Sequence, residues 1–166
     1  MKKTIAQRIT AVCVGSLAIG LLAEPAMAGL RTSTATGGGP NNAADASCIK
    51  YNFGTVENTC TRDVAWEWPL VIDRQNDSIP VEVNVTGNNG TIKCRAVGID
   101  APITQLVFVS GGNYAFNSHG AGIHSEKLSL NIQVPLIGPF VPAGGFLIVQ
   151  CILGPNGRIN GVDWNL

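Results

Sequence analysis

Apolar and polar residues alternate along several segments of this chain, and the alternation restricts its fold more than any other feature. Segments 64–72, 81–86 and 128–134 each place a large apolar residue at every second position. Because successive side chains of a strand point to opposite faces, each segment predicts a β-strand with one buried face. No segment after residue 28 shows the 3.6-residue period of an amphipathic helix. The sequence therefore predicts an all-β protein.

Turn signals separate the predicted strands. The Gly-Asn-Asn-Gly sequence at 87–90 tolerates positive φ and predicts a hairpin that returns the chain into residues 91–99. Residues 146–153 are almost continuously apolar and predict a central strand, which the turn at 155–157 follows. Seven or eight short strands, with turn signals about every ten residues, are typical of a single antiparallel β-sandwich. We expect this domain to span residues 48–166.

The cysteines indicate that two disulfides stabilise the sandwich. Four of the five cysteines follow residue 28, namely Cys48, Cys60, Cys94 and Cys151. An even set in an exported chain predicts two disulfides. Strand parity turns Cys94 and Cys151 inward, which favours a bond between them across the core and leaves Cys48 and Cys60 to close a local loop. The other two connectivities stay open. Without a Cys-x-x-Cys pair we expect no metal centre and no cofactor.

Residues 1–28 have the pattern of a bacterial signal peptide. A basic start precedes the apolar run 9–23, and Ala26-Met27-Ala28 offers a cleavage site. The run of 15 residues is shorter than the roughly 20 that span a bilayer, so we expect cleavage and a secreted or periplasmic protein without stable membrane insertion. Residues 29–47 are rich in Gly, Ser, Thr, Ala and Asn, which predicts a flexible leader.

Charge argues against nucleic acid as a partner. The whole chain has 11 basic and 11 acidic residues. Cleavage after residue 28 would remove three basic residues and one acidic residue. The predicted mature protein is therefore slightly acidic. Nucleic-acid binding requires a basic face that displaces phosphate counterions, so we expect a protein or glycan partner instead.

Aromatic residues supply one set of candidate binding residues. Trp66 and Trp68 lie two positions apart and share a strand face. Their simplest interpretation is burial in the core of the sandwich. If that face were exposed, the two indoles together with Tyr114 could stack on a sugar or a peptide.

Two histidines supply a second candidate site. His119 and His124 flank Gly120-Ala121-Gly122-Ile123 in a loop rich in Gly, Asn and Ser. They could bind a metal, or act as acid and base near Ser110, Ser118 or Asp100. No local catalytic motif positions either ring, so the simpler interpretation is two solvated loop residues.

A largely apolar stretch of 20 residues without a charge, residues 134–153, raises a third possibility. Three prolines and a Gly-Gly pair interrupt it, and they argue against a continuous transmembrane helix because proline breaks helical hydrogen bonding. The stretch instead predicts a strand, a loop and a second strand. Within the loop, Phe140 either folds back under the sandwich or belongs to an apolar tip, residues 136–141, that contacts a partner or lipid headgroups. We expect it to fold back.

Several short pieces occur in a characteristic order: Cys48, Gly54-Thr55-Val56-Glu57-Asn58, Trp68-Pro69-Leu70, Ile92-Lys93-Cys94, and Val149-Gln150-Cys151 before Pro155-Asn156. This order resembles a loose group of uncharacterised exported bacterial proteins, and the similarity covers most of the chain after residue 28. The resemblance implies an exported β-sandwich with disulfides and supplies no active residues. Phe53-Gly54-Thr55-Val56 also resembles the first strand of some fimbrial subunits.

These observations favour an exported, non-enzymatic binding or cell-surface module, because no catalytic motif accompanies the signal peptide and the disulfide-linked strands. A second hypothesis is a subunit of an extracellular fibre or coat, with which a strand-rich chain and a flexible leader are compatible. Fimbrial subunits donate an alternating apolar N-terminal strand, and residues 29–47 lack that alternation. A third hypothesis is a hydrolase that uses His119 or His124.

Overall fold

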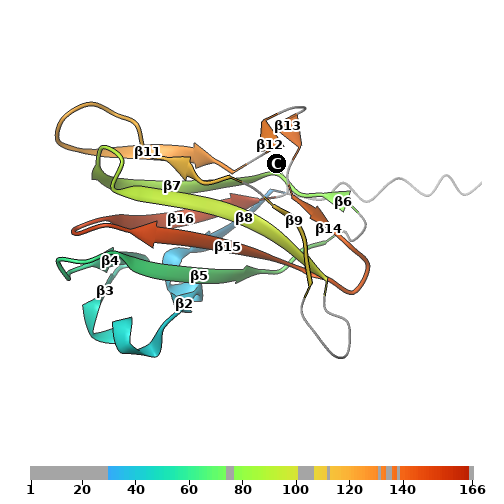
Figure 1. Cartoon of the computed structure of the whole chain (residues 1–166), viewed down its shortest axis with the longest axis horizontal. Helices are drawn as coiled ribbons and strands as arrows, with labels where there is room; N and C mark the ends of the chain where they lie inside the picture. The colour runs from blue at the N-terminus through green and yellow to red at the C-terminus, as the bar shows by residue number, and fades with distance from the viewer. Residues whose placement is uncertain are drawn as a thin grey trace, which may run out of the picture.

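The computed structural model describes residues 30–73, 77–100, 107–111, 113–130, 132–133, 136–137 and 139–164. Within them the protein is an antiparallel β-sandwich of two six-stranded sheets (Figure 1), and two separate two-stranded sheets are also present. The all-β sandwich predicted from the alternation and the two disulfides predicted from the cysteines are confirmed. The described residues hold more than the expected seven or eight strands, because several segments of two to four residues also pair.

The first sheet has the order β11-β7-β16-β4-β3, and β1 also pairs with β16. The predicted alternating strand 81–86 is part of β7, which lies between the edge strand β11 and the C-terminal strand β16. Its members are β1 (Arg31–Thr34), β3 (Ile49–Asn52), β4 (Thr55–Asn58), β7 (Val81–Asn88), β11 (Ile123–Ser129) and β16 (Arg158–Trp164).

The second sheet has the order β10-β8-β15-β5-β2, and β9 also pairs with β8. The apolar segment 146–153 is its central strand, as its composition predicted. The members are β2 (Gly39–Pro40), β5 (Val64–Leu70), β8 (Ile92–Asp100), β9 (Val107–Gly111), β10 (Ala115–Phe116) and β15 (Phe146–Leu153). Smaller elements are β6 (Asp77–Ser78), β12 (Ile132–Gln133), β13 (Leu136–Ile137), β14 (Phe140–Val141), η1 (Ala35–Gly37) and η2 (Ala43–Cys48).

The turn after β7 connects the two sheets, and it does not form the hydrogen-bonded hairpin predicted between residues 81–86 and 91–99. β7 pairs with β11 and β16, whereas β8 pairs with β10, β15 and β9. The glycines do reverse the chain, and Gly90 has a φ of 71°. A turn signal shows that the chain reverses, but strand pairing depends on which faces can be buried together.

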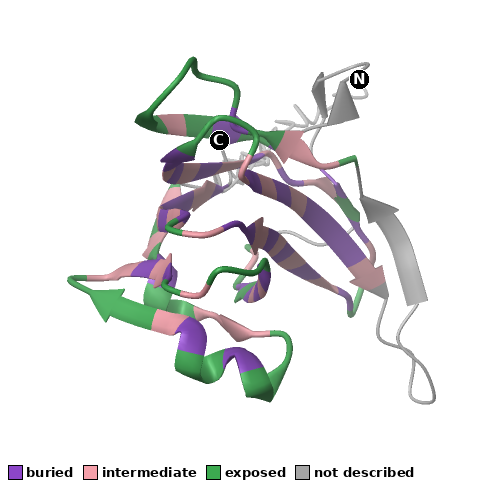
Figure 2. Ribbon diagram, turned by 60° about the vertical axis from the view of Figure 1, so that its left-hand side comes forward, coloured by how far each residue is buried: buried purple, intermediate pink, exposed green. Residues whose placement is uncertain are grey.

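The core lies between the inner faces of the two sheets. Buried and intermediate residues alternate along the strands (Figure 2), as a period of two requires. Trp66 is 0% exposed and Trp68 is 1% exposed, so both indoles are core residues. Their simplest interpretation is confirmed, and the alternative of an exposed pair that stacks on a ligand is wrong. The neighbours of the indoles on β5, Val64 and Leu70, are buried with them.

The N-terminal segment is part of the sandwich, so the expected flexible leader over residues 29–47 is wrong in the described part of that range. β1 pairs with β16 of the first sheet, and β2 pairs with β5 of the second. Ala35, between them, is completely buried. A methyl group added to Gly38 would lie 2.6 Å from Trp66 Nε1, and one on Gly37 would lie 3.0 Å from Trp68 Nε1. The small residues therefore allow the backbone to approach the indoles closely.

Both disulfides have the expected connectivity. Cys94 and Cys151 lie directly opposite each other on β8 and β15, with their Cα atoms 4.1 Å apart, and both are buried. The bond therefore joins neighbouring strands of one sheet and does not cross the core between the two sheets. Cys48 and Cys60 form the second bond, which closes a loop at a sequence separation of 12.

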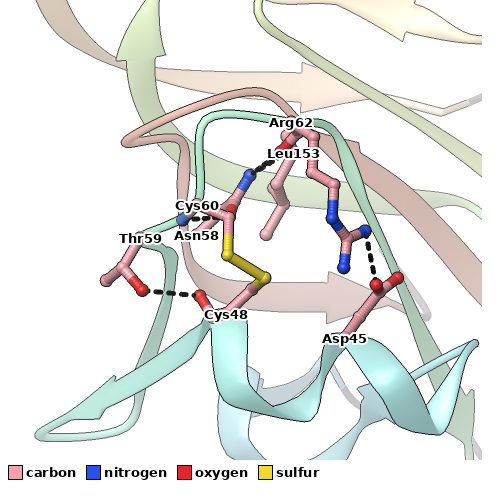
Figure 3. The surroundings of a disulfide bond; sticks show 7 residues. All are labelled: Asp45, Cys48, Asn58, Thr59, Cys60, Arg62 and Leu153. Carbon is pink, nitrogen blue, oxygen red and sulfur yellow. Dashed lines mark hydrogen bonds and ion pairs between the residues drawn. A yellow bond between two sulfur atoms is a disulfide. The ribbon is translucent and has the colours of Figure 1, made fainter.

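The Cys48–Cys60 bond lies next to the side chain of Asn58 (Figure 3). Asn58 is 0% exposed. Its Nδ2 donates to the carbonyl oxygens of Arg62 and Leu153 at 2.7 and 2.8 Å, and its Oδ1 accepts from the Cys60 N–H at 2.9 Å. The Arg62 side chain also forms an ion pair with Asp45 on η2. One amide thus fixes the end of β4 to β15 beside the disulfide.

Phe140 does not fold back under the sandwich, and that expectation is wrong. It is 38% exposed, while its neighbour Val141 is completely buried. Both residues pair as β14 with β6, so strand alternation turns one side chain inward and the other outward. Across the described residues, no helix is long and apolar enough to cross a membrane.

Candidate functional site

The outer faces of the two sheets differ in how their polar groups are satisfied. On the first sheet, Lys127 forms ion pairs with Glu82 and Asp163, and Arg158 pairs with Glu57 at 2.9 Å. The Asp163 carboxylate accepts further hydrogen bonds from Thr32 and Asn84, which outweigh burial and lower its pKa. Burial alone would raise that pKa. The charges on this face are therefore largely neutralised by one another.

The outer face of the second sheet carries a line of hydrogen-bonded side chains, which we call the polar row: Asn41, Glu67, Gln150, Arg95 and Tyr114. Gln150 on β15 lies opposite Glu67 of β5 on one side and Arg95 of β8 on the other. Its Nε2 donates to Glu67 Oε1 at 2.8 Å, and its Oε1 accepts from Arg95 Nε at 2.9 Å and from the Tyr114 hydroxyl at 2.8 Å. Asn41 donates to Glu67 at the β2 end.

A shallow hollow of about 160 Å³ lies beside the polar row. Glu67, Gln150 and Arg95 form its polar side, and Val97, Ile99 and Ile148 form its apolar side. It is smaller than the roughly 300–1,000 Å³ of sites that enclose a small molecule. The hollow is therefore too small to enclose a typical small molecule.

Hydrogen-bonding capacity remains at the hollow. The bonds of Glu67 use only Oε1, and that of Arg95 uses only Nε, so within the described part of the chain Glu67 Oε2 and the two terminal guanidinium nitrogens have no partner. The hydrogen bonds between Glu67, Gln150 and Arg95 hold these side chains in place. The face thus presents a fixed acceptor and fixed donors to a ligand without further ordering of the side chains.

The sequence singled out one member of the polar row, Tyr114. Its ring is half-buried and contacts Lys93 and Arg95, whose Nζ and Cζ atoms lie 5.5 and 4.9 Å from the ring centre. Glu67, Arg95 and Gln150 were missed, because each is only the polar alternate of a strand whose apolar face attracted attention. The signal available in the sequence was that these outward positions are occupied by large hydrogen-bonding side chains.

The two predicted histidines lie close together, and each has a polar neighbour. His119 Nδ1 lies 3.0 Å from Glu126 Oε2, and the two imidazole centres are 6.1 Å apart. His124 Nε2 lies 3.1 Å from the Ala121 carbonyl oxygen. Burial opposes ionisation of Glu126, but hydrogen bonds from Ser118 and from His119 outweigh it and lower the pKa of this carboxyl.

Ser118 bonds to the same carboxylate and not to an imidazole. A serine nucleophile requires the histidine between the hydroxyl and the acid, whereas here the acid lies between them. The side chains of Asp100 and Ser110 lie outside the described residues. Among those that are described, no group of three or more His, Cys, Asp and Glu side chains is arranged to hold a metal.

One exposed aromatic hairpin was not identified from the sequence. Phe53 lies at the tip between β3 and β4, fully exposed, with a φ of 44°. Gly54 follows with a φ of 85°, so both turn residues have the positive φ that a type I′ hairpin requires. Tyr51 is 55% exposed, and its ring packs edge-on against Trp66, with the two ring centres 6.0 Å apart. A bulky residue at positive φ is unfavourable, so Phe53 does not stabilise the turn.

Comparison with known proteins assigns no family. No family model and no curated protein matches this chain. A solved structure described as "CBM4 structure and function" is similar over 82% of this chain and 82% of that chain, at 7% sequence identity and a TM-score of 0.31. A TM-score this low is insufficient to transfer a site, a ligand or a partner to this protein.

Proposed function

We propose that this protein is an exported, non-enzymatic binding module whose ligand lies across the outer face of the second sheet. The observation that supports the proposal is the polar row beside its hollow. The row contains an acceptor and donors that the described part of the fold leaves unused, whereas on the opposite face Lys127 and Arg158 are paired with carboxylates. Fixed polar groups next to an apolar wall are the usual composition of a binding site.

The position of the site also supports binding without chemistry. The row lies on an open sheet face, and its members are bonded to one another in a chain from β2 to β10. None of the row's members is a serine, cysteine or histidine, so the row lacks the nucleophile and base pair on which acyl transfer depends. Export is supported by the pattern of residues 1–28 and by the two disulfides, which form in oxidising compartments.

Substitution of the central residue of the row tests this proposal. The oxidised mature protein is screened against immobilised glycans and peptides, and any ligand found is titrated against Gln150→Ala and against Thr86→Ala. Thr86 lies on the outer face of the first sheet, where its hydroxyl bonds to Asn160 and Ser125. We expect Gln150→Ala to weaken binding about tenfold or more, and Thr86→Ala to leave it unchanged. A ligand that responds only to Thr86→Ala, or no ligand at all, would contradict the proposal.

A further inference from the structure

Two cationic side chains lie side by side at the β8 end of the polar row. Lys93 and Arg95 are two residues apart on one strand and therefore project from the same face. Both contact the ring of Tyr114. Within the described ranges neither forms an ion pair with a carboxylate, whereas Lys127 and Arg158 on the opposite face do. This end of the row is thus positively charged in a protein that we expect to be slightly acidic.

An anionic group is the complement of this arrangement. Like charges held close together repel each other, and an anion between them removes that repulsion. The two terminal nitrogens of Arg95 have the planar geometry that binds a carboxylate or a sulfate through two parallel hydrogen bonds. The Tyr114 ring holds both cations toward this position through cation–π contacts, so the site is formed before a ligand arrives.

The remainder of the row is complementary to hydroxyl groups. Glu67 Oε2 accepts a hydrogen bond, Gln150 lies next to it, and Val97, Ile99 and Ile148 offer an apolar surface to the C–H face of a ring. Strands are spaced about 4.8 Å apart, so a row that crosses from β2 to β10 extends over roughly 19 Å. That length accommodates several linked rings. An extended peptide instead adds to a sheet edge through main-chain hydrogen bonds, which a sheet face does not offer.

We propose that the ligand is an acidic polysaccharide, whose carboxylate or sulfate binds between Lys93 and Arg95 and whose hydroxyls bind to Glu67 and Gln150. This inference rests on the proposed function, and it adds the chemical class of the ligand. The acidic group of one sugar lies at the β8 end, and neighbouring rings extend over the hollow toward β5.

The test measures binding of the oxidised mature protein to four polymers in the same buffer: polygalacturonate, dextran sulfate, neutral dextran and poly-glutamate. We expect binding to at least one of the two acidic polysaccharides, and little binding to dextran or poly-glutamate. Polygalacturonate and dextran sulfate separate the carboxylate from the sulfate as the group recognised. The affinity should fall as salt is added, because the contact is electrostatic.

Three variants with the same change of charge locate the contact. Arg95→Gln should weaken binding about tenfold or more, and Lys93→Gln severalfold. Lys50→Gln on β3 is the matched control, since Lys50 is exposed and lies outside the row, and it should bind as the unaltered protein does. The melting temperature of each variant is measured, so that a loss of binding is not mistaken for a loss of folding.

The outcomes separate this inference from the proposed function. Three results would overturn the assignment of an acidic polysaccharide as the ligand. They are equal losses of binding in all three variants, stronger binding to poly-glutamate, and no binding to either acidic polysaccharide. A neutral or peptide ligand that is lost in Gln150→Ala but retained in Arg95→Gln would overturn it too, and would leave the binding face in place. A ligand that tolerates both substitutions would overturn the proposed function itself.

Discussion

Substitution of two neighbouring glycines tests whether the N-terminal segment is part of the folded domain. A Cβ atom on Gly38 would lie 2.3 Å from the Glu67 carbonyl oxygen and 2.6 Å from Trp66 Nε1, whereas one on Gly39 would meet no atom within 4 Å. The carbonyl belongs to the backbone of β5 and cannot rotate away. Gly38→Ala must therefore move the segment off β5. Gly39→Ala adds the same methyl group one residue later, where no atom opposes it.

The expected magnitudes follow from these distances. Extra volume in a well-packed position typically costs 1–3 kcal/mol, so we expect Gly38→Ala to lower the free energy of unfolding by about 2 kcal/mol. Gly39→Ala should change it by no more than about 1 kcal/mol, and in the stabilising direction, because alanine restricts the unfolded chain. In a domain of this size the first change corresponds to a melting temperature lower by roughly 6–10 °C.

Urea unfolding of the oxidised mature protein, followed by tryptophan fluorescence, measures both variants. Trp66 and Trp68 lie next to the segment, so the signal reports on this region directly. A lower midpoint with an unchanged slope in Gly38→Ala alone supports the packing argument. If both variants unfold at the midpoint of the unaltered protein, the segment does not pack on β5, and the reasoning is refuted.

Three further predictions concern stability. Phe53→Asn places a residue that tolerates positive φ before Gly54, so it should raise the free energy of unfolding by about 1 kcal/mol, and a lower melting temperature would contradict the strain assigned to Phe53. Asn58→Ala removes the side-chain hydrogen bonds to two carbonyl oxygens and one N–H, and should cost about 3 kcal/mol in urea unfolding, whereas the exposed Asn52→Ala should cost little. Asp163, whose pKa is lowered from 3.8, stabilises the fold above about pH 4, and this contribution is lost as the pH falls through its folded pKa. Asp163→Asn should therefore lower the melting temperature at pH 7 and flatten its decline below pH 4, and an unchanged acid profile would exclude this role.

Much of the fold follows from local patterns in the sequence. The alternation at Val64–Leu70 and Val81–Asn88 fixed which side chains are buried, because a strand has only two faces and one of them is apolar. Parity also placed Cys94 and Cys151 on inward faces, and their bond is confirmed. The core position of Trp66 and Trp68 follows from the same argument.

The tertiary structure decided which segments lie next to one another. Composition predicted a flexible leader, since small residues bury little surface by themselves. In the structure, two indoles from β5 occupy the space that side chains at positions 37 and 38 would fill. The polar row joins residues from β5, β8 and β15 with residues next to β2 and β10. Each member is an outward polar residue of its own strand, so no local pattern shows that these side chains meet. Only the register between strands distant in sequence brings their side chains within hydrogen-bonding distance.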